Sequence, residues 1–111
     1  MIEIILYEYL KEALEEPVYM QRPEKAPQRY ILLEKTGSSE VNHIKSATFA
    51  FQSYAESLYQ AAALNERVKT AIENSVQLNE ISSVRLNSDY NFTDVSGKQY
   101  RYQALFVFTH Y

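Results

Sequence analysis

The chain has 111 residues, a net charge of −3, 46% hydrophobic residues and 23% charged residues, which is enough to build one domain around a single core. It contains no Cys, so disulfides and thiolate metal sites are excluded. Apolar runs fall short of the roughly 18 residues of a transmembrane helix, and the basic residues form no stripe of the kind that nucleic-acid-binding proteins use. We expect one domain over residues 1–111.

The first segment has the pattern of an amphipathic helix. Apolar residues recur at helical spacing up to the turn before Pro17, which disfavours helix at the residue preceding it; they are Ile2, Ile5, Leu6, Tyr9, Leu10, Ala13 and Leu14. The opposite face is acidic, whereas a helix that lies on a membrane surface has a basic polar face. The segment also lacks the basic start and the cleavage site of a signal peptide. We therefore expect a core-packed helix in a protein that stays in the cytoplasm of the cell that makes it.

Two short apolar runs follow, separated by a loop with two prolines. Residues 18–20 are predicted to form a short strand and residues 30–35 a strongly apolar one, with residues 22–27 as the loop. The simplest interpretation is an antiparallel hairpin with a long, charged tip. Residues 36–40, which are polar and include Gly37, are predicted to be a turn or loop that leads to the next strand.

The stretch from residue 44 to residue 78 combines a strand with the longest helix. Ala47, Phe49 and Phe51 alternate with polar or small residues, as in a half-buried strand. Ser53 and Glu56 then match a capping box, which predicts that the helix starts there. An apolar stripe at helical spacing follows, formed by Leu58, Ala61, Ala62, Leu64, Val68, Ala71, Ile72 and Val76.

The last third reads as a hairpin with its turn at residues 94–97. Folding at that turn would place Tyr90 beside Tyr102 and Phe92 beside Tyr100. One face of each strand is apolar, formed by Val84, Leu86, Tyr90 and Phe92 and by Tyr100, Tyr102, Ala104, Phe106 and Phe108. Leu105 and Val107 make the second face of the last strand apolar as well. That strand is then either a central strand covered on both sides, which we favour, or one whose second face meets a partner chain.

These elements have the order α-β-β-β-α-β-β, which predicts an α+β fold with two helices packed on a mainly antiparallel sheet. Residue types that carry chemistry are scarce. The two histidines, His43 and His110, are far apart in the sequence and have no Cys or clustered carboxylates beside them, and two glycines cannot form a phosphate-binding loop. We expect neither an enzyme nor a cofactor or metal site. Basic residues flank the proline loop and could contact DNA or an acidic partner, although a solvated loop is the favoured interpretation.

Several segments resemble small proteins encoded by phages and prophages of Gram-positive bacteria. They are residues 17–27 (PVYMQRPEKAP), 30–37 (YILLEKTG), 47–55 (ATFAFQSYA), 86–94 (LNSDYNFTD) and the closing residues 100–108. Such proteins are found in the head–tail joining and tail gene cluster, and the chain is similar to tail terminator or tail completion proteins over nearly its whole length.

The resemblance implies an α+β fold and a structural role in the virion. Tail terminators form a ring of six subunits that caps the tail tube where it meets the head connector. The expected partners are therefore other copies of the chain, tail-tube proteins and head-connector proteins. DNA would pass through the lumen without specific binding, and neither a membrane nor a cofactor is involved. The protein is then expected in the virion, at the head–tail joint, and in the host cytoplasm during assembly.

A cyclic ring needs two different contact patches on each subunit. The candidates are the proline loop with its flanks (Tyr19, Arg22, Lys25, Arg29 and Tyr30) and the second face of the last strand (Leu105 and Val107). Two alternatives stay open. The chain could be another head–tail connector or minor tail component, or it could be a small cytosolic binding or regulatory module with the same α+β appearance.

Overall fold

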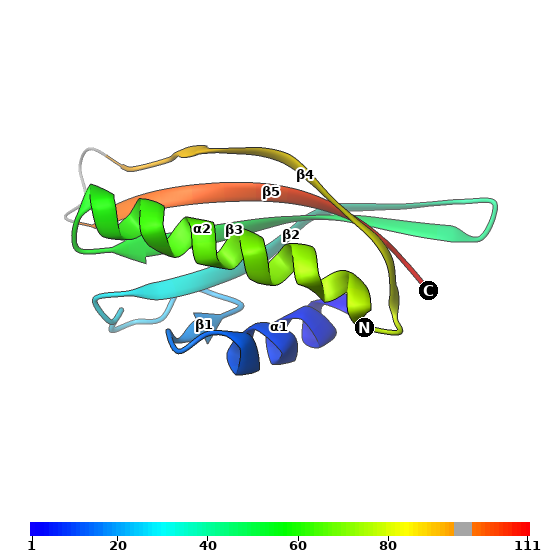
Figure 1. Cartoon of the computed structure of the whole chain (residues 1–111), viewed down its shortest axis with the longest axis horizontal. Coiled ribbons are helices and arrows are strands. Elements are labelled where there is room, and N and C mark those ends of the chain that lie inside the picture. Colours follow the sequence, from blue (N-terminus) through cyan, green and yellow to red (C-terminus); the bar gives the residue numbers. More distant parts are fainter. Residues whose placement is uncertain (95–98) are drawn as a thin grey trace.

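A computed structural model describes residues 1–94 and 99–111. The chain order is α1 (Ile2–Ala13), β1 (Val18–Tyr19), β2 (Tyr30–Val41), β3 (Ile44–Ala55), α2 (Leu58–Asn74), the 3₁₀ turn η1 (Ser75–Gln77), β4 (Ile81–Asn91) and β5 (Tyr100–His110). The strands form one sheet in the order β1-β2-β3-β5-β4 (Figure 1). The predicted α+β class and element order are confirmed. Within the described residues, no helix is long and apolar enough to cross a membrane.

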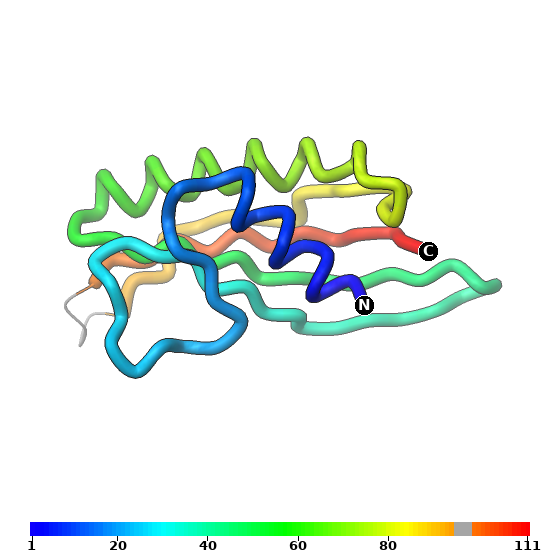
Figure 2. Tube along the Cα trace, turned by 90° about the horizontal axis from the view of Figure 1, so that it is seen from below, coloured from blue at the N-terminus to red at the C-terminus, as the bar shows by residue number. Residues whose placement is uncertain are grey.

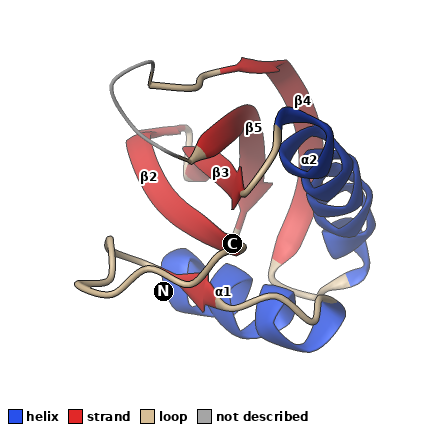
Figure 3. Ribbon diagram, turned by 90° about the vertical axis from the view of Figure 1, so that its left-hand side faces the viewer, coloured by secondary structure: helices blue, strands red, loops and turns tan. Residues whose placement is uncertain are grey.

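Both helices pack on the same side of the sheet, which we call the inner face (Figure 3). Period-two alternation turns four phenylalanines of β3 and β5 toward them, and the rings meet edge to face, as between Phe49 and Phe108 with centroids 5.6 Å apart. The helices add one apolar stripe each. The largest contributors to this core are Leu6 and Leu10 of α1, Leu64, Val68 and Ile72 of α2, and Ile31, Leu33, Phe49, Phe51, Phe106 and Phe108 of the sheet. The opposite side of the sheet, which we call the outer face, carries neither helix.

The hairpin of β2 and β3 projects from the body of the molecule (Figures 1 and 2). The prediction of a turn or loop at residues 36–40 was wrong, because β2 continues through them to Val41. Gly37 pairs with Thr48 after a bulge between Lys35 and Gly37. The turn is formed by Asn42 and His43, whose φ angles of 52° and 66° suit a two-residue hairpin. Residues 36–45, which we call the arm, are all exposed. An exposed strand needs no apolar alternation, so its polar residues look like a loop.

The antiparallel pairing predicted between residues 18–20 and 30–35 was also wrong. β1 runs parallel to β2, with Val18 level with Ile31, and the amide of Ile31 donates to the carbonyl of Pro17 at 2.9 Å. A parallel pair requires the connecting chain to return to the end where the first strand began. Residues 20–29 are long enough to do so, and they form the wide bend that Figure 2 shows at one end of the sheet.

Helix α2 begins four residues later than the capping box indicated. Ser53 lies inside β3, where it pairs with Ile31 on one side and with Tyr102 on the other. It is fully buried, and its hydroxyl has no hydrogen-bond partner in the described structure. The cap is instead Ser57, whose hydroxyl accepts from the amide of Gln60 at 3.1 Å. By sequence, Ser53 and Ser57 are both suitable N-cap residues for α2. Because β3 pairs with β2 on one side and β5 on the other, Ser53 stays in the strand and Ser57 becomes the cap.

The C-terminal hairpin is present with a register one residue away from the prediction. Tyr90 lies opposite Gln103 rather than Tyr102, because β4 has a bulge between Leu86 and Ser88. A bulge reverses which residues face the core, so Leu86 belongs to the inner face and Tyr90 to the outer face. Of the turn predicted at residues 94–97, residues 95–97 lie outside the described part of the chain.

Candidate interaction surfaces

A group of aromatic and arginine side chains lies at the end of the sheet opposite the arm. Tyr30 of β2 stacks on Tyr54 of β3, with ring centroids 4.4 Å apart and planes at 6°. Tyr19 of β1 meets Tyr30 edge to face at 5.8 Å. The guanidinium of Arg22, from the proline loop, lies over the Tyr54 ring at 5.8 Å. The structure therefore brings together three of the predicted interface residues, Tyr19, Arg22 and Tyr30.

Arg101 and Phe92 complete this group of side chains. We call it the arginine–aromatic cluster; its members are Tyr19, Arg22, Tyr30, Tyr54, Phe92 and Arg101. Arg101 of β5 lies 5.5 Å from the centroid of Tyr54 and 4.3 Å from that of Phe92, and its Nη1 donates to the Tyr54 hydroxyl at 2.9 Å. Neither Tyr54 nor Arg101 was among the site residues predicted from the sequence. The alternation of β3 would have indicated which face Tyr54 occupies, since it follows Gln52 on the outer face. Nothing in the local sequence joins Arg101 to Tyr54, because the contact depends on the pairing of β3 with β5.

Tyr30 is the buried centre of this cluster and not a contact residue. Its side chain has no exposed surface, and burial raises the pKa of its hydroxyl, with a smaller contribution from Tyr54, while Arg22 acts in the opposite direction. Tyr19 is half-buried and Arg22 is exposed. A partner at this end of the molecule would therefore touch Arg22 and the rim of Tyr19, whose positions Tyr30 supports from below.

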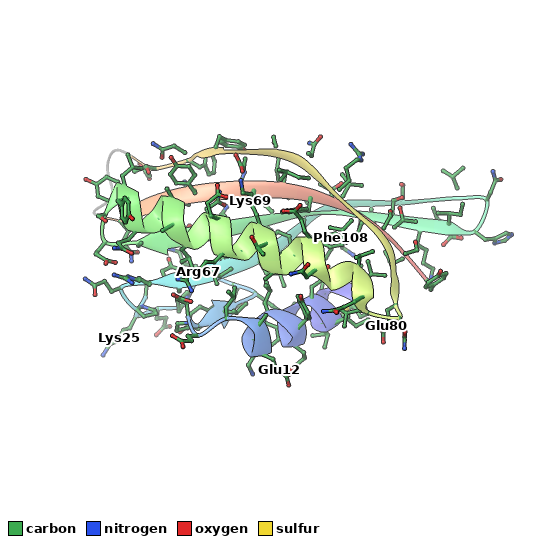
Figure 4. The ribbon with its side chains drawn as sticks, viewed as in Figure 1. Glu12, Lys25, Arg67, Lys69, Glu80 and Phe108 are labelled. Carbon is green, nitrogen blue, oxygen red and sulfur yellow. The ribbon has the colours of Figure 1, made fainter. Side chains whose placement is uncertain are left out.

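The proline loop is anchored at its C-terminal end. Arg29 forms a hydrogen-bonded ion pair with Glu56, which lies between β3 and α2, and this contact lowers the pKa of the Glu56 carboxyl. Gln99 donates to the carbonyl of Pro27 at 3.1 Å. Lys25 is exposed and points away from the body in Figure 4. Of the three predicted basic contact residues, Arg29 is thus used within the chain, whereas Arg22 and Lys25 are exposed.

A chain of hydrogen bonds crosses the outer face near the cluster. The Tyr54 hydroxyl donates to Gln52 Oε1 at 2.9 Å, Gln52 Nε2 donates to Gln103 Oε1 at 2.7 Å, and Gln103 Nε2 donates to the Tyr90 hydroxyl at 2.6 Å. The chain joins β3, β5 and β4, and both glutamines are buried. Buried amides bonded at both ends fix the pairing of strands, because a slipped register would leave them without partners.

Leu105 and Val107 lie further along the same outer face. β5 is a central strand, between β3 and β4, and Leu105 is level with Ala50 and Ser88 while Val107 is level with Thr48 and Arg85. Both side chains are half-buried. The part of the chain that the structure describes places no helix or further strand over them. The strand is therefore central, but the second half of the favoured interpretation, a cover on both sides, is not met by any helix or strand among the described residues.

The arm supplies the most exposed apolar residues of the sheet. Val41 and Ile44, which flank the turn, are 66% and 56% exposed. A hollow of about 390 Å³ lies between the base of the arm and the start of α1, lined by Met1, Lys35, Lys45 and His110 among others. Lys35 reaches across to Glu3 of α1, with 3.1 Å between Nζ and Oε2. The arm was not among the predicted interface segments, because its polar residues were interpreted as a loop.

The remaining charged groups mostly tie elements together. Arg67 of α2 pairs with Glu16, just after α1, and this bond is the main reason that the pKa of the Glu16 carboxyl is lowered. Lys69, on the other side of α2 (Figure 4), pairs with Asp89 of β4, which raises the pKa of the lysine. Across residues 1–94 and 99–111, no three His, Asp or Glu side chains gather closely enough to hold a metal ion.

Comparison with models of known protein families finds no match to this chain, and comparison with individually characterised proteins finds none either.

Proposed function

We propose that the chain is a structural protein of a phage virion, a tail terminator or tail completion protein that forms a ring at the head–tail interface. The observation that carries this proposal is the arm. Residues 36–45 extend a two-stranded hairpin beyond the body and leave both of its faces in solvent. Such an element contributes little to the core of its own chain and suits contact with another chain.

The arrangement of surfaces supports the same role. The arm and the arginine–aromatic cluster lie at opposite ends of a molecule whose extents are 45 × 25 × 24 Å. A protein that joins two assemblies needs separate surfaces for them, and this chain offers one at each end. The resemblance of the five segments to tail proteins, described above, supplies the identity of the assemblies: the tail tube and the head connector.

The test locates the protein in particles. A strain that carries the gene is induced, particles are purified, and gold-labelled antibody against the chain is viewed by electron microscopy. We expect label at the head–tail joint. In parallel, the purified chain is measured by mass photometry in the presence of isolated tails, where six copies of 12.9 kDa give a ring of about 77 kDa on tail ends.

The alternatives give different outcomes. Label confined to the head or to the distal tail would indicate a different connector or minor tail component. Protein found only in the free cytosol, with no copy in purified particles, would refute a virion role and favour a small binding or regulatory module.

A further inference from the structure

The sheet has two free edges that face opposite directions. On one side, β1 covers β2 only at Ile31 and Leu32, so residues 33–41 of β2 have no strand beyond them in the described structure. On the other side, the described residues place no strand beyond β4, so its outer edge is free of strand pairing from Ser82 to Asn91. Each edge presents a row of unpaired backbone N–H and C=O groups, the ordinary template for adding another strand.

The two free stretches lie at the same level of the sheet. Reading the register across from β2 through β3 and β5, Leu33 is level with Asp89 of β4, and Ser39 is level with Ser83. Residues 33–40 of β2 are therefore level with residues 81–89 of β4. A second copy placed beside the first, without any shift along the strands, would bring one free stretch directly against the other.

The strand directions also fit. β2, β3, β5 and β4 alternate in direction along the sheet, so β2 and β4 run antiparallel to each other. In copies that keep the same orientation, β2 of one copy would meet β4 of the next in an antiparallel ladder. The contact joins two different patches, so it does not stop at a dimer, and it closes into a ring when a constant rotation between neighbouring copies adds up to a full turn.

The two edges carry few of the features that commonly prevent such pairing. Pro is absent from residues 33–41 and from Ile81–Asn91. The one lysine, Lys35, is turned toward Glu3 on the inner side. Bulges interrupt both strands, but they leave most of each edge regular. Lys and Pro at edges are common means of blocking aggregation, and these two edges have little of that protection.

Charges on the outer face complement one another across this joint. Glu34 is level with Ser88, and the next outer-face position of β4 is Arg85, because the bulge at residue 87 is skipped. Both Glu34 and Arg85 are exposed, and neither takes part in an ion pair within the described chain. In the joined sheet, the Glu34 carboxylate of one copy would lie one outer-face position along the strand from the Arg85 guanidinium of the next copy.

We infer that copies of the chain join through these edges, with residues 33–40 of β2 pairing with β4 of the neighbouring copy to continue one sheet from subunit to subunit. This inference rests on the proposed ring and specifies its joint. It places the base of the arm in the subunit contact, and it leaves the tip, Val41 and Ile44, to reach past the neighbour's sheet.

The absence of Cys makes a direct test possible. The double variant Ser39→Cys/Ser83→Cys puts one thiol on each edge at level positions of the outer face. Directly opposite residues in an antiparallel ladder have Cα atoms about 4.5–5.5 Å apart, which a disulfide can span. After mild oxidation of particles or of tail-bound rings, we expect a ladder of disulfide-linked multimers on a non-reducing gel.

Matched controls separate a specific joint from chance oxidation. Each single variant carries one thiol per chain and cannot give a ladder, whereas a strong dimer from Ser39→Cys alone would show a two-fold contact and refute the inference. The variant Ser38→Cys/Ser83→Cys moves one thiol to the other face of the arm, and we expect little cross-linking. Equal ladders from it and from the first double variant would also refute the register.

Charge reversal provides a second measurement that needs no oxidation. Glu34→Lys and Arg85→Glu should each raise the protein concentration for half-maximal ring assembly by roughly tenfold, and the two together should restore it. Rings that form at the 77 kDa mass without cross-links or charge coupling would overturn this joint and leave the proposed function intact. Absence of the protein from particles would remove the proposed function, and this inference with it.

Discussion

The N-cap of α2 gives the sharpest quantitative prediction. Ser57→Ala removes the hydroxyl that accepts from the Gln60 amide at 3.1 Å, and losing a Ser cap costs about 1 kcal/mol of the free energy of unfolding. Unfolding entropy of about 2.1 cal/mol/K per residue, taken over 111 residues, converts this into a melting temperature lower by about 4 °C. Differential scanning calorimetry at neutral pH measures both quantities.

Ser53→Ala is the matched control, because Ser53 is the residue that the sequence indicates as the cap. In the structure its hydroxyl is buried without a partner, and burying an unsatisfied hydroxyl costs stability. Its removal should therefore leave the melting temperature unchanged or raise it slightly. A variant Ser53→Ala that is less stable than Ser57→Ala would refute the assignment of the helix start and of the end of β3.

Three further outcomes are expected. Arg67→Met should cost less than about 1 kcal/mol at pH 7; because Arg67 lowers the pKa of Glu16 from its ordinary 4.5, the difference from the parent should shrink as pH falls below that value, as urea denaturation across pH 3–7 would show. Tyr9→Phe removes the 2.7 Å hydrogen bond from the Tyr9 hydroxyl to the Ala71 carbonyl and should cost about 1 kcal/mol by the same assay; an unchanged midpoint would contradict the α1–α2 contact. His43→Gly relieves a positive φ of 66° and should raise stability by up to about 1 kcal/mol; a loss instead would argue against the tight turn.

The fold class was predictable because it depends on periodicity. Alternation in β3 and β5 and the stripes of α1 and α2 report burial, and burial is what the core requires. The wrong predictions concern segments in which the pattern of buried residues does not indicate the secondary structure. The outer part of β2 is exposed on both faces, so Gly37 and its polar neighbours resemble a loop. The bulge at residue 87 is one extra residue that pairing with β5 accommodates, and no local pattern marks it.

The candidate site was predictable only in part, for a related reason. Tyr19, Arg22 and Tyr30 were identified because they flank a distinctive loop, and they do meet. Their shared partner, Tyr54, comes from a strand distant in sequence, and the sheet order alone brings it to them. The edge-to-edge match of β2 and β4 likewise requires the registers of three strand pairs, which composition and spacing do not contain.

The length of the arm sets how far its turn lies from the body of the molecule. Its residues take no part in the core, so its length is not set by the packing of the domain. Adding two residues to each of its strands would move the turn outward by about 7 Å and keep every side chain on its present face. If the chain forms the proposed ring, we expect related chains in rings of different diameter to differ in this hairpin by even numbers of residues per strand, while the domain beneath it stays the same.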